Sequence, residues 1–167
     1  ERQDRFKSRV EKMGTILQYE GIPEDVASLL VLVAGEIGDN SFAHNLGNWP
    51  DITGIYFSYD ARNRNIVLAD RGLGILATLK RVRPELNDSS EALKIAFTET
   101  VSGRFPEARG NGLKFVRSVI IENPFTLKFQ TGDASLFLKE HDKDLSVSQA
   151  EEYFGGCLAV IGYEDSI

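Results

Sequence analysis

The 167-residue sequence has a single cysteine, Cys157, and no excess of positive charge. One thiol cannot form an internal disulfide and supplies no cysteine spacing for a metal site, so we expect a buried, inert thiol in a reducing, cytoplasmic setting. The net charge of −6 argues against a surface for polyanions, and nucleic acid is therefore not an expected partner. A local cluster of arginines can still bind a small phosphate ligand.

Long hydrophobic runs are also missing. The longest apolar run, residues 27–34, is well short of the ~18–20 residues that cross a bilayer, so no membrane-spanning segment is expected here. The length and the hydrophobic content of 42% are enough for one complete core. The sequence starts at Glu1 without an initiating Met, so we expect it to be a segment of a longer protein.

Residues 1–20 are predicted to form an N-terminal amphipathic helix ahead of a domain that spans residues 21–167. Phe6, Val10, Met13 and Leu17 recur at spacings of three and four, which places them in one apolar stripe. Two interpretations of this stripe remain open at this point. It can be the surface of a homodimer or of another partner, or it can fold back onto the core of its own domain.

The remaining pattern predicts alternating helices and hairpins. A second helix is expected from Pro23 to about residue 45. Further helices are expected at residues 75–82, 89–97 and 112–122, with a loop at 98–111. The expected strands are 52–59, 65–69, 126–131, 135–139 and 157–163, with a hairpin turn at 132–133 and a polar segment at 141–152. Hairpins imply antiparallel pairing, so we expect a two-layer α+β sandwich whose mixed, mostly antiparallel sheet is covered by helices on one face.

Glu36, Asn40 and His44 stand four residues apart in the second helix, so they form one polar column on an otherwise apolar segment. A solvated helix face explains this column, and a core histidine bonded to backbone explains His44 equally well. The functional alternative is a site for a hard cation, in which Asn40 supplies an oxygen ligand for Mg²⁺. Glu36, one turn away, would then orient or deprotonate a water or hydroxyl near a phosphate.

Two glycine-containing segments give similar alternatives. Asp70, Gly72 and Gly74 follow a predicted strand and form either a plain turn or a loop whose carboxylate accepts from an exocyclic amine such as that of adenine. Gly110 and Gly112 flank the start of a predicted helix.

That helix start is either a flexible entry or an anion site made of exposed amides at Gly110, Asn111 and Gly112. Arg104 and Arg109 lie nearby in the sequence and would strengthen an anion site.

In this order and with these separations, the motifs resemble the GHKL ATPase superfamily, which includes gyrase, heat-shock chaperones, histidine kinases, mismatch-repair proteins and anti-sigma serine kinases. Residues 36–44 (EIGDNSFAH) resemble its first box, residues 70–75 (DRGLGI) its first glycine box and residues 109–113 (RGNGL) its second. Residues 155–158 (GGCL) are similar to the Gly-Thr step that opens the last strand of the family. The resemblance covers roughly residues 24–163.

The resemblance implies ATP and Mg²⁺ as ligands and a role for each matched residue. It makes Asn40 the Mg²⁺ ligand, Glu36 the catalytic residue and Asp70 the adenine-reading residue, and it makes residues 98–109 the lid over ATP. The other implied nucleotide-binding residues are His44, Gly72, Gly74, Arg104, Arg109, Gly110, Asn111, Gly112 and Leu113.

Departures from the family pattern narrow the expected function. Ala43 stands where histidine kinases usually have Lys, which makes the pattern closer to the anti-sigma kinases. His44 and His141 are the only histidines, so autophosphorylation on the N-terminal helix is not expected. The resemblance therefore implies an ATP-dependent regulatory protein kinase module that acts with a protein partner or phosphoacceptor. The alternatives are an ATP hydrolase of the gyrase and chaperone type and a nucleotide-gated interaction module without phosphotransfer.

Overall fold

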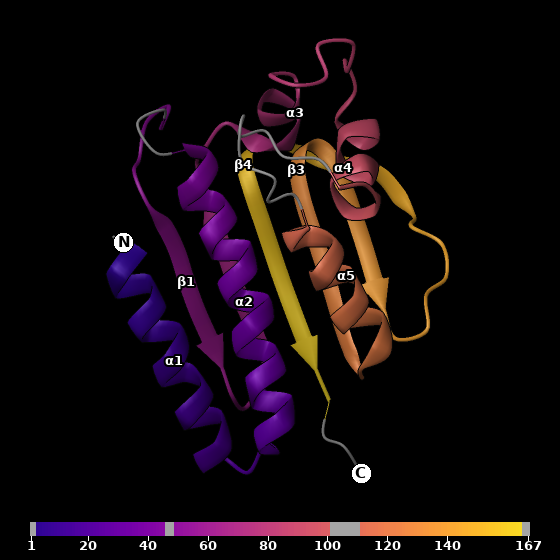
Figure 1. Ribbon diagram of the computed structural model, residues 1–167. Coiled ribbons are helices and arrows are strands. Elements are labelled where there is room, and N and C mark those ends of the chain that lie inside the picture. The colour runs from indigo at the N-terminus through magenta and orange to yellow at the C-terminus, as the bar shows by residue number, and fades with distance from the viewer. Residues whose placement is uncertain (1–2, 46–48, 101–110, 165–167) are drawn as a thin grey trace.

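The computed structural model describes residues 3–45, 49–100 and 111–164, which fold into five helices and four strands. In chain order these are α1 (Gln3–Tyr19), α2 (Glu24–Asn45), β1 (Ile55–Asp60), β2 (Asn65–Asp70), α3 (Gly74–Leu79), α4 (Ser89–Thr98), α5 (Gly112–Glu122), β3 (Phe125–Lys139) and β4 (Val147–Tyr163). Figure 1 shows α1, α2 and α5 lying along the strands, with α3 and α4 gathered at one end of the sheet.

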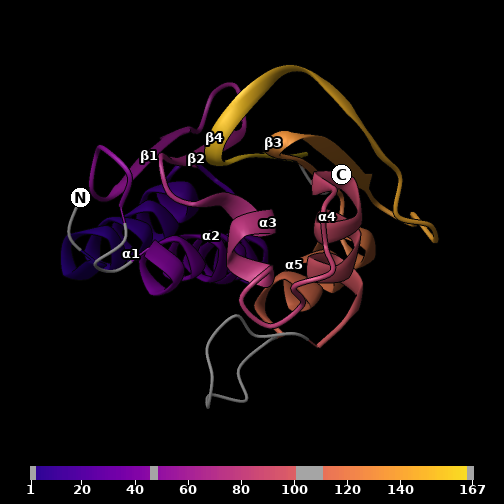
Figure 2. The same cartoon turned by 90° about the horizontal axis from the view of Figure 1, so that it is seen from above.

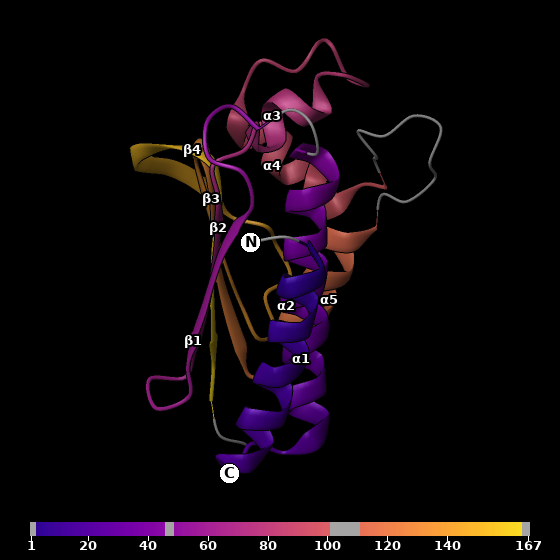
Figure 3. The ribbon, with the colours of Figure 1, turned by 90° about the vertical axis from the view of Figure 1, so that its left-hand side faces the viewer.

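The four strands form one sheet in the order β1-β2-β4-β3. Each pair of neighbours is antiparallel, so β4, the last strand of the chain, lies between β2 and β3. Seen from the side, the helices cover one face of this sheet (Figure 3). The expected two-layer α+β sandwich is confirmed, and the strands described are wholly antiparallel rather than mixed.

Helix α2 is the central element of the core. It packs against α1, α5 and the strands β1 and β2, and its Ala27, Leu30 and Val33 have no exposed surface. By length and composition alone, α2 is apolar enough to cross a membrane, and half of its most apolar stretch is buried inside this domain. Packing on both sides and against the sheet accounts for that composition.

The apolar stripe of α1 is buried within the same chain. Phe6, Met13 and Leu17 have no exposed surface and Val10 is 3% exposed, because the stripe packs on α2 and β1. Gly38 of α2 makes room for this contact, since a Cβ there would lie 2.0 Å from the Phe6 ring. Of the two interpretations of the stripe, the helix folded back onto its own core is the one observed.

The predicted hairpin at residues 132–133 is wrong. Strand β3 runs straight through this point to Lys139, and the turn comes later, before β4 begins at Val147. Gly132 has a φ of +57° and marks a register shift, so the turn-like signal belongs to a β-bulge. The expected start of the last strand at residue 157 is also wrong, because β4 begins at Val147 and includes the second half of the polar segment 141–152. The ribbon formed by the far ends of β3 and β4 curves away from the sheet (Figure 2).

Smaller corrections concern the ends of two elements. The first strand begins at Ile55 rather than at residue 52, because Gly54 has a φ of +96° and breaks the extended chain. Helix α3 ends at Leu79 rather than at residue 82. Its last turn tightens there, since the amide of Val82 donates to the carbonyl of Leu79 three residues earlier. Most of the predicted loop 98–111 lies outside the described residues.

Candidate functional site

A pocket lies between the C-terminal half of α2, the start of α3, the start of α5 and the helix-covered face of the sheet. It encloses about 370 Å³ of space, including its open mouth. Five predicted site residues line it, namely Asn40, His44, Asp70, Gly74 and Leu113. Residues from all three boxes, which are separated by up to 73 positions in the sequence, therefore meet in one concave site.

Asp70 forms the polar floor of this pocket and is only 4% exposed. One carboxylate oxygen accepts from the Ser41 hydroxyl at 2.6 Å, and the other accepts from the Gly72 amide at 2.7 Å. Burial raises the pKa of Asp70, although these hydrogen bonds act in the opposite direction. Each carboxylate oxygen has two lone pairs, so the group keeps accepting capacity for a ligand.

Ser41 and Asn45 were missed as site residues by sequence reasoning. They stand four residues apart, so they form a second polar column on α2 beside the first. Asn45 is 4% exposed; it donates to the Ser41 carbonyl at 2.9 Å and accepts from the Leu73 amide at 2.8 Å. The i, i+4 spacing was a usable signal, and the role of this column is to tie the glycine loop to α2.

Glycines let the backbone segments around Asp70 approach one another. A Cβ on Gly72 would lie 2.1 Å from the Asn45 side chain, and a Cβ on Gly156 would lie 2.1 Å from the Asp70 carbonyl oxygen. Gly156 also has a φ of +101°, which L side chains rarely adopt. The loop after β2 is therefore packed directly on β4, backbone against backbone.

Thr131 is a further residue that the sequence did not single out. It is 2% exposed, and its hydroxyl accepts from the Ile75 amide at 3.1 Å and donates to the Gly156 carbonyl at 2.8 Å. It therefore joins the start of α3 to β3 and β4. No signal was available for it, because its position depends on the bulge that sequence reasoning took for a hairpin turn.

The start of α5 lies against the polar column of α2. A Cβ on Gly112 would be 2.7 Å from a carboxylate oxygen of Glu36 and 3.1 Å from the amide nitrogen of Asn40. Asn40 lines the pocket and is partly exposed, whereas Glu36, one helical turn before it, does not line the pocket but is exposed. No group of three or more His, Cys, Asp or Glu side chains within the described ranges forms a metal site by itself.

Glu36 and Asn40 would offer Mg²⁺ one carboxylate and one carboxamide group. Carboxylate and carboxamide oxygens suit that ion, which keeps several waters and is commonly held by one or two protein ligands together with phosphate oxygens. Glu36 and Asn40 therefore fit a metal that arrives with a phosphate ligand. They do not form a closed protein cage.

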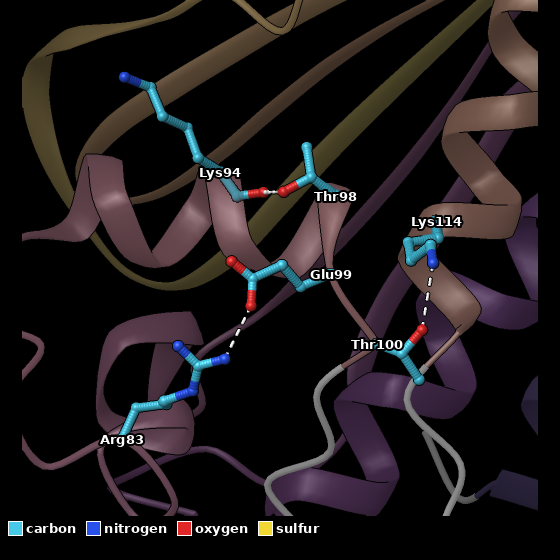
Figure 4. Close-up of polar contacts among 6 residues, drawn as sticks. All are labelled: Arg83, Lys94, Thr98, Glu99, Thr100 and Lys114. Carbon is cyan, nitrogen blue, oxygen red and sulfur yellow. Dashed lines mark hydrogen bonds and ion pairs between the residues drawn. The ribbon is translucent and has the colours of Figure 1, made fainter.

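Polar contacts brace the chain on either side of residues 101–110. The Thr100 hydroxyl donates to the Asn111 side chain at 2.8 Å. It also accepts from the Lys114 ammonium at 3.1 Å (Figure 4). Arg83 and Glu99 form an ion pair at 2.7 Å that ties the connection before α4 to the end of that helix. The predicted site residues Arg104, Arg109 and Gly110 lie outside the described part of the chain.

Cys157 lines the pocket beside Asp70, with which it is in register. Burial, reinforced by the charge of Asp70, raises the pKa of the Cys157 thiol well above its usual value. A raised pKa keeps the group protonated at neutral pH, which agrees with the inert thiol expected from the sequence, although Cys157 is partly exposed rather than fully buried.

Comparison with known proteins gives matches among solved structures only, since no family model and no curated protein matches the sequence. One is the 43K ATPase domain of Thermus thermophilus gyrase B in complex with an aminocoumarin, with 16% identity and a TM-score of 0.47 over 80% of this chain. Another is the ATPase region of Saccharomyces cerevisiae topoisomerase II, with 15% identity and a TM-score of 0.49 over 83% of this chain. The chain spans 33% and 38% of those two chains, and similarity at this level assigns no activity to it.

Proposed function

We propose that this chain is an ATP·Mg²⁺-binding domain of the GHKL type that acts as a regulatory protein kinase module. The observation that carries the proposal is the single pocket lined by Asn40, Asp70 and Leu113, one residue from each of the three boxes. A small-molecule site is expected to be a concave, mostly apolar pocket with a few convergent polar groups, and this pocket has that character.

The adenine end of the ligand belongs at Asp70. Its carboxylate is held by Ser41 and Gly72, so it faces the pocket without free rotation. An exocyclic amine would donate to this carboxylate, and a hydrogen bond to a charged acceptor contributes about 1.5–3 kcal/mol. Guanine has a carbonyl at the matching position, and an acceptor opposite the Asp70 carboxylate is repelled. ATP should therefore be preferred over GTP.

The phosphate end belongs at the rim, between the α2 column and the start of α5. Exposed amides at the first turn of an 11-residue helix attract anions, and Gly112 lets the phosphates approach Glu36 and Asn40 closely. When bound there, Mg²⁺ would neutralise part of the phosphate charge. Asn40 is its protein ligand in this proposal, and Glu36 accepts the proton of the attacking hydroxyl.

Calorimetric titration with ATP, ADP and GTP, with and without Mg²⁺, tests the binding site. We expect ATP to bind at least about ten times more tightly than GTP, from one lost charged hydrogen bond. The Asn40→Ala variant should lose the dependence on Mg²⁺ while it still binds adenosine. Equal affinity for ATP and GTP would refute the role of Asp70, and unchanged Mg²⁺ dependence in the variant would refute the role of Asn40.

Transfer of labelled γ-phosphate from ATP to candidate partner proteins tests the kinase role. Glu36→Gln should bind ATP with unchanged affinity but lose transfer by a factor of about 10²–10⁴, the usual contribution of a general base. Phosphate release without any protein acceptor, abolished by the same variant, would instead identify a hydrolase. Intact ATP after long incubation with every partner would leave the nucleotide-gated interaction module as the function.

A further inference from the structure

A second and wider cleft lies on the other side of α3 from the nucleotide pocket. It encloses about 900 Å³, including its open mouth, between α3, the start of α4 and the bulge where β3 and β4 change register. Within the described part of the chain, Gly74 alone lines both hollows. The cleft is therefore a separate site, and no described side chain that was predicted to bind nucleotide lines it.

An unusual bulge in β4 forms one wall of this cleft. Between the paired positions Gly132↔Phe154 and Ala134↔Gln149, β3 has one residue, Asp133, whereas β4 has the four residues 150–153. The extra residues are braced, because the Gln130 side chain donates to the Glu152 carbonyl at 2.7 Å. A bulge of this kind redirects side chains out of the ladder. Here it presents the Tyr153 ring, which is 77% exposed, at the edge of the cleft.

Two fixed carboxylates line the same cleft as this ring. Asp88 is held at the start of α4, where it accepts from the Glu91 amide at 2.7 Å. Asp133 accepts from the Gln149 amide at 3.3 Å, and hydrogen bonds from Ser89 and Gln149 hold its pKa below the usual range. The lowered pKa keeps Asp133 ionised at neutral pH. Among the residues that line the cleft, Lys80 carries a positive charge.

The surrounding ribbon extends the negative charge of the cleft. Residues 131–154 contain six acidic residues and two lysines, so this ribbon accounts for −4 of the net charge of −6. The acidic residues are Asp133, Glu140, Asp142, Asp144, Glu151 and Glu152. An anionic ligand is therefore disfavoured here, and a cationic one is attracted from a distance.

We propose that this cleft is a docking site for a basic segment of a partner protein, in which an arginine or lysine side chain lies over the Tyr153 ring between the carboxylates of Asp88 and Asp133. A cation over an aromatic face is attracted by the negative charge of the ring, and fixed carboxylates add directional acceptors for a guanidinium group. The preformed cleft and the braced bulge reduce the ordering that binding requires.

The proposal is tested by NMR titration of the ¹⁵N-labelled, nucleotide-free chain with acetyl-Gly-Arg-Gly-amide. The matched probe carries citrulline, which has nearly the same shape as arginine but no charge. We expect saturable shifts centred on the amides of Asn87, Gly132 and Tyr153, and at least about five-fold weaker binding of the citrulline peptide. This result is independent of ATP, so it can fail while the nucleotide site stands, and the reverse also holds.

Three variants distinguish binding in the cleft from general attraction by the negative charge of the ribbon. Asp133→Asn and Tyr153→Leu should each weaken binding by about two- to five-fold, the range of an exposed cation–aromatic contact. Glu140→Gln removes the same charge from the far end of the ribbon and should leave the affinity unchanged. Equal binding of the two peptides, shifts spread along residues 139–144, the absence of a saturable shift, or equal weakening by Glu140→Gln would each overturn the proposal. Both test side chains are exposed at the surface, and an unchanged thermal midpoint verifies the fold of each variant.

Discussion

Replacing Asp70 by Asn should make the protein more stable at neutral pH while it weakens ATP binding. The carboxylate is 4% exposed, and burial raises its pKa despite the hydrogen bonds from Ser41 and Gly72. An asparagine fits the same contacts. Its oxygen accepts from the Gly72 amide and its amide donates to the Ser41 hydroxyl, which then donates to the Ile37 carbonyl that it already faces at 3.5 Å.

The sign of the pH dependence follows from the raised pKa. Well below the ordinary value of 3.8, Asp70 is neutral in both the folded and the unfolded chain, so wild type and variant have similar free energies of unfolding. As pH rises from there to the higher folded pKa, the unfolded chain ionises first and the wild type loses stability relative to Asp70→Asn. The difference in free energy of unfolding grows by at most about 1.4 kcal/mol per pH unit, and it is constant above the pKa that Asp70 has in the folded chain.

Asp60→Asn provides a control of opposite sign. Hydrogen bonds, chiefly from the Asn63 amide and side chain, lower the pKa of Asp60, so its stabilising effect is present at neutral pH and is lost as pH falls. The Asp60 variant should therefore be less stable than wild type at neutral pH, with a difference that shrinks on acidification.

Urea denaturation of the wild type and both variants between about pH 3 and pH 8 measures these differences. Calorimetry should show ATP affinity reduced about 10- to 100-fold in Asp70→Asn, because one charged acceptor is lost. If the difference in free energy of unfolding between wild type and Asp70→Asn does not grow with pH, Asp70 is not a destabilising buried charge. Undiminished ATP affinity would refute the role of that charge in binding.

Three further predictions concern packing, and urea denaturation measures each of them. Gly38→Ala should cost about 1–3 kcal/mol, since the new methyl would overlap the Phe6 ring, whereas Gly35→Ala, with open space around its Cβ, should stabilise α2 by about 0.5–1 kcal/mol. Equal effects of the two would contradict the docking of α1. Gly156→Ala should cost at least about 2 kcal/mol, because its Cβ meets the Asp70 carbonyl and its φ is positive, and Gly155→Ala, whose nearest neighbour is at 4.0 Å, serves as the control. Thr131→Val should cost about 1–3 kcal/mol by leaving the Ile75 amide and the Gly156 carbonyl without this partner. Thr98→Val, which removes an exposed hydroxyl bonded to the Lys94 carbonyl (Figure 4), should stay within about 0.5 kcal/mol of wild type.

The parts of the fold that depend on local periodicity could be predicted from the sequence. The spacing of Phe6, Val10, Met13 and Leu17 predicted α1, although only the tertiary packing decided which surface the stripe covers. The chain through Gly132 could not be predicted, because a glycine followed by an aspartate has the same local signature in a hairpin turn and in a bulge. Pairing with a strand that begins at Val147 decides between them, and that pairing is a long-range property.

The candidate site divides in the same way. The column of Glu36, Asn40 and His44 was visible as a pattern within one helix, and the neighbouring column of Ser41 and Asn45 was equally visible but was not used. Thr131 supports the site only because β3 and β4 pair beside the loop after β2. Groups contributed by strand pairing leave no local signal for sequence reasoning to find.

These supporting contacts also explain how the adenine end of the site would select its ligand. Asn45 holds the Leu73 amide, Thr131 holds the Ile75 amide, and Ser41 orients Asp70. A ligand that enters a pocket fixed in this way loses little free energy to ordering the protein, so more of each hydrogen bond appears as affinity. Because the acceptor at Asp70 cannot rotate away from a mismatched carbonyl, rigidity increases discrimination between bases as well as affinity. In the proposed function, the buried charge would therefore lower the stability of the domain and, in the same contact, provide its selectivity for adenine.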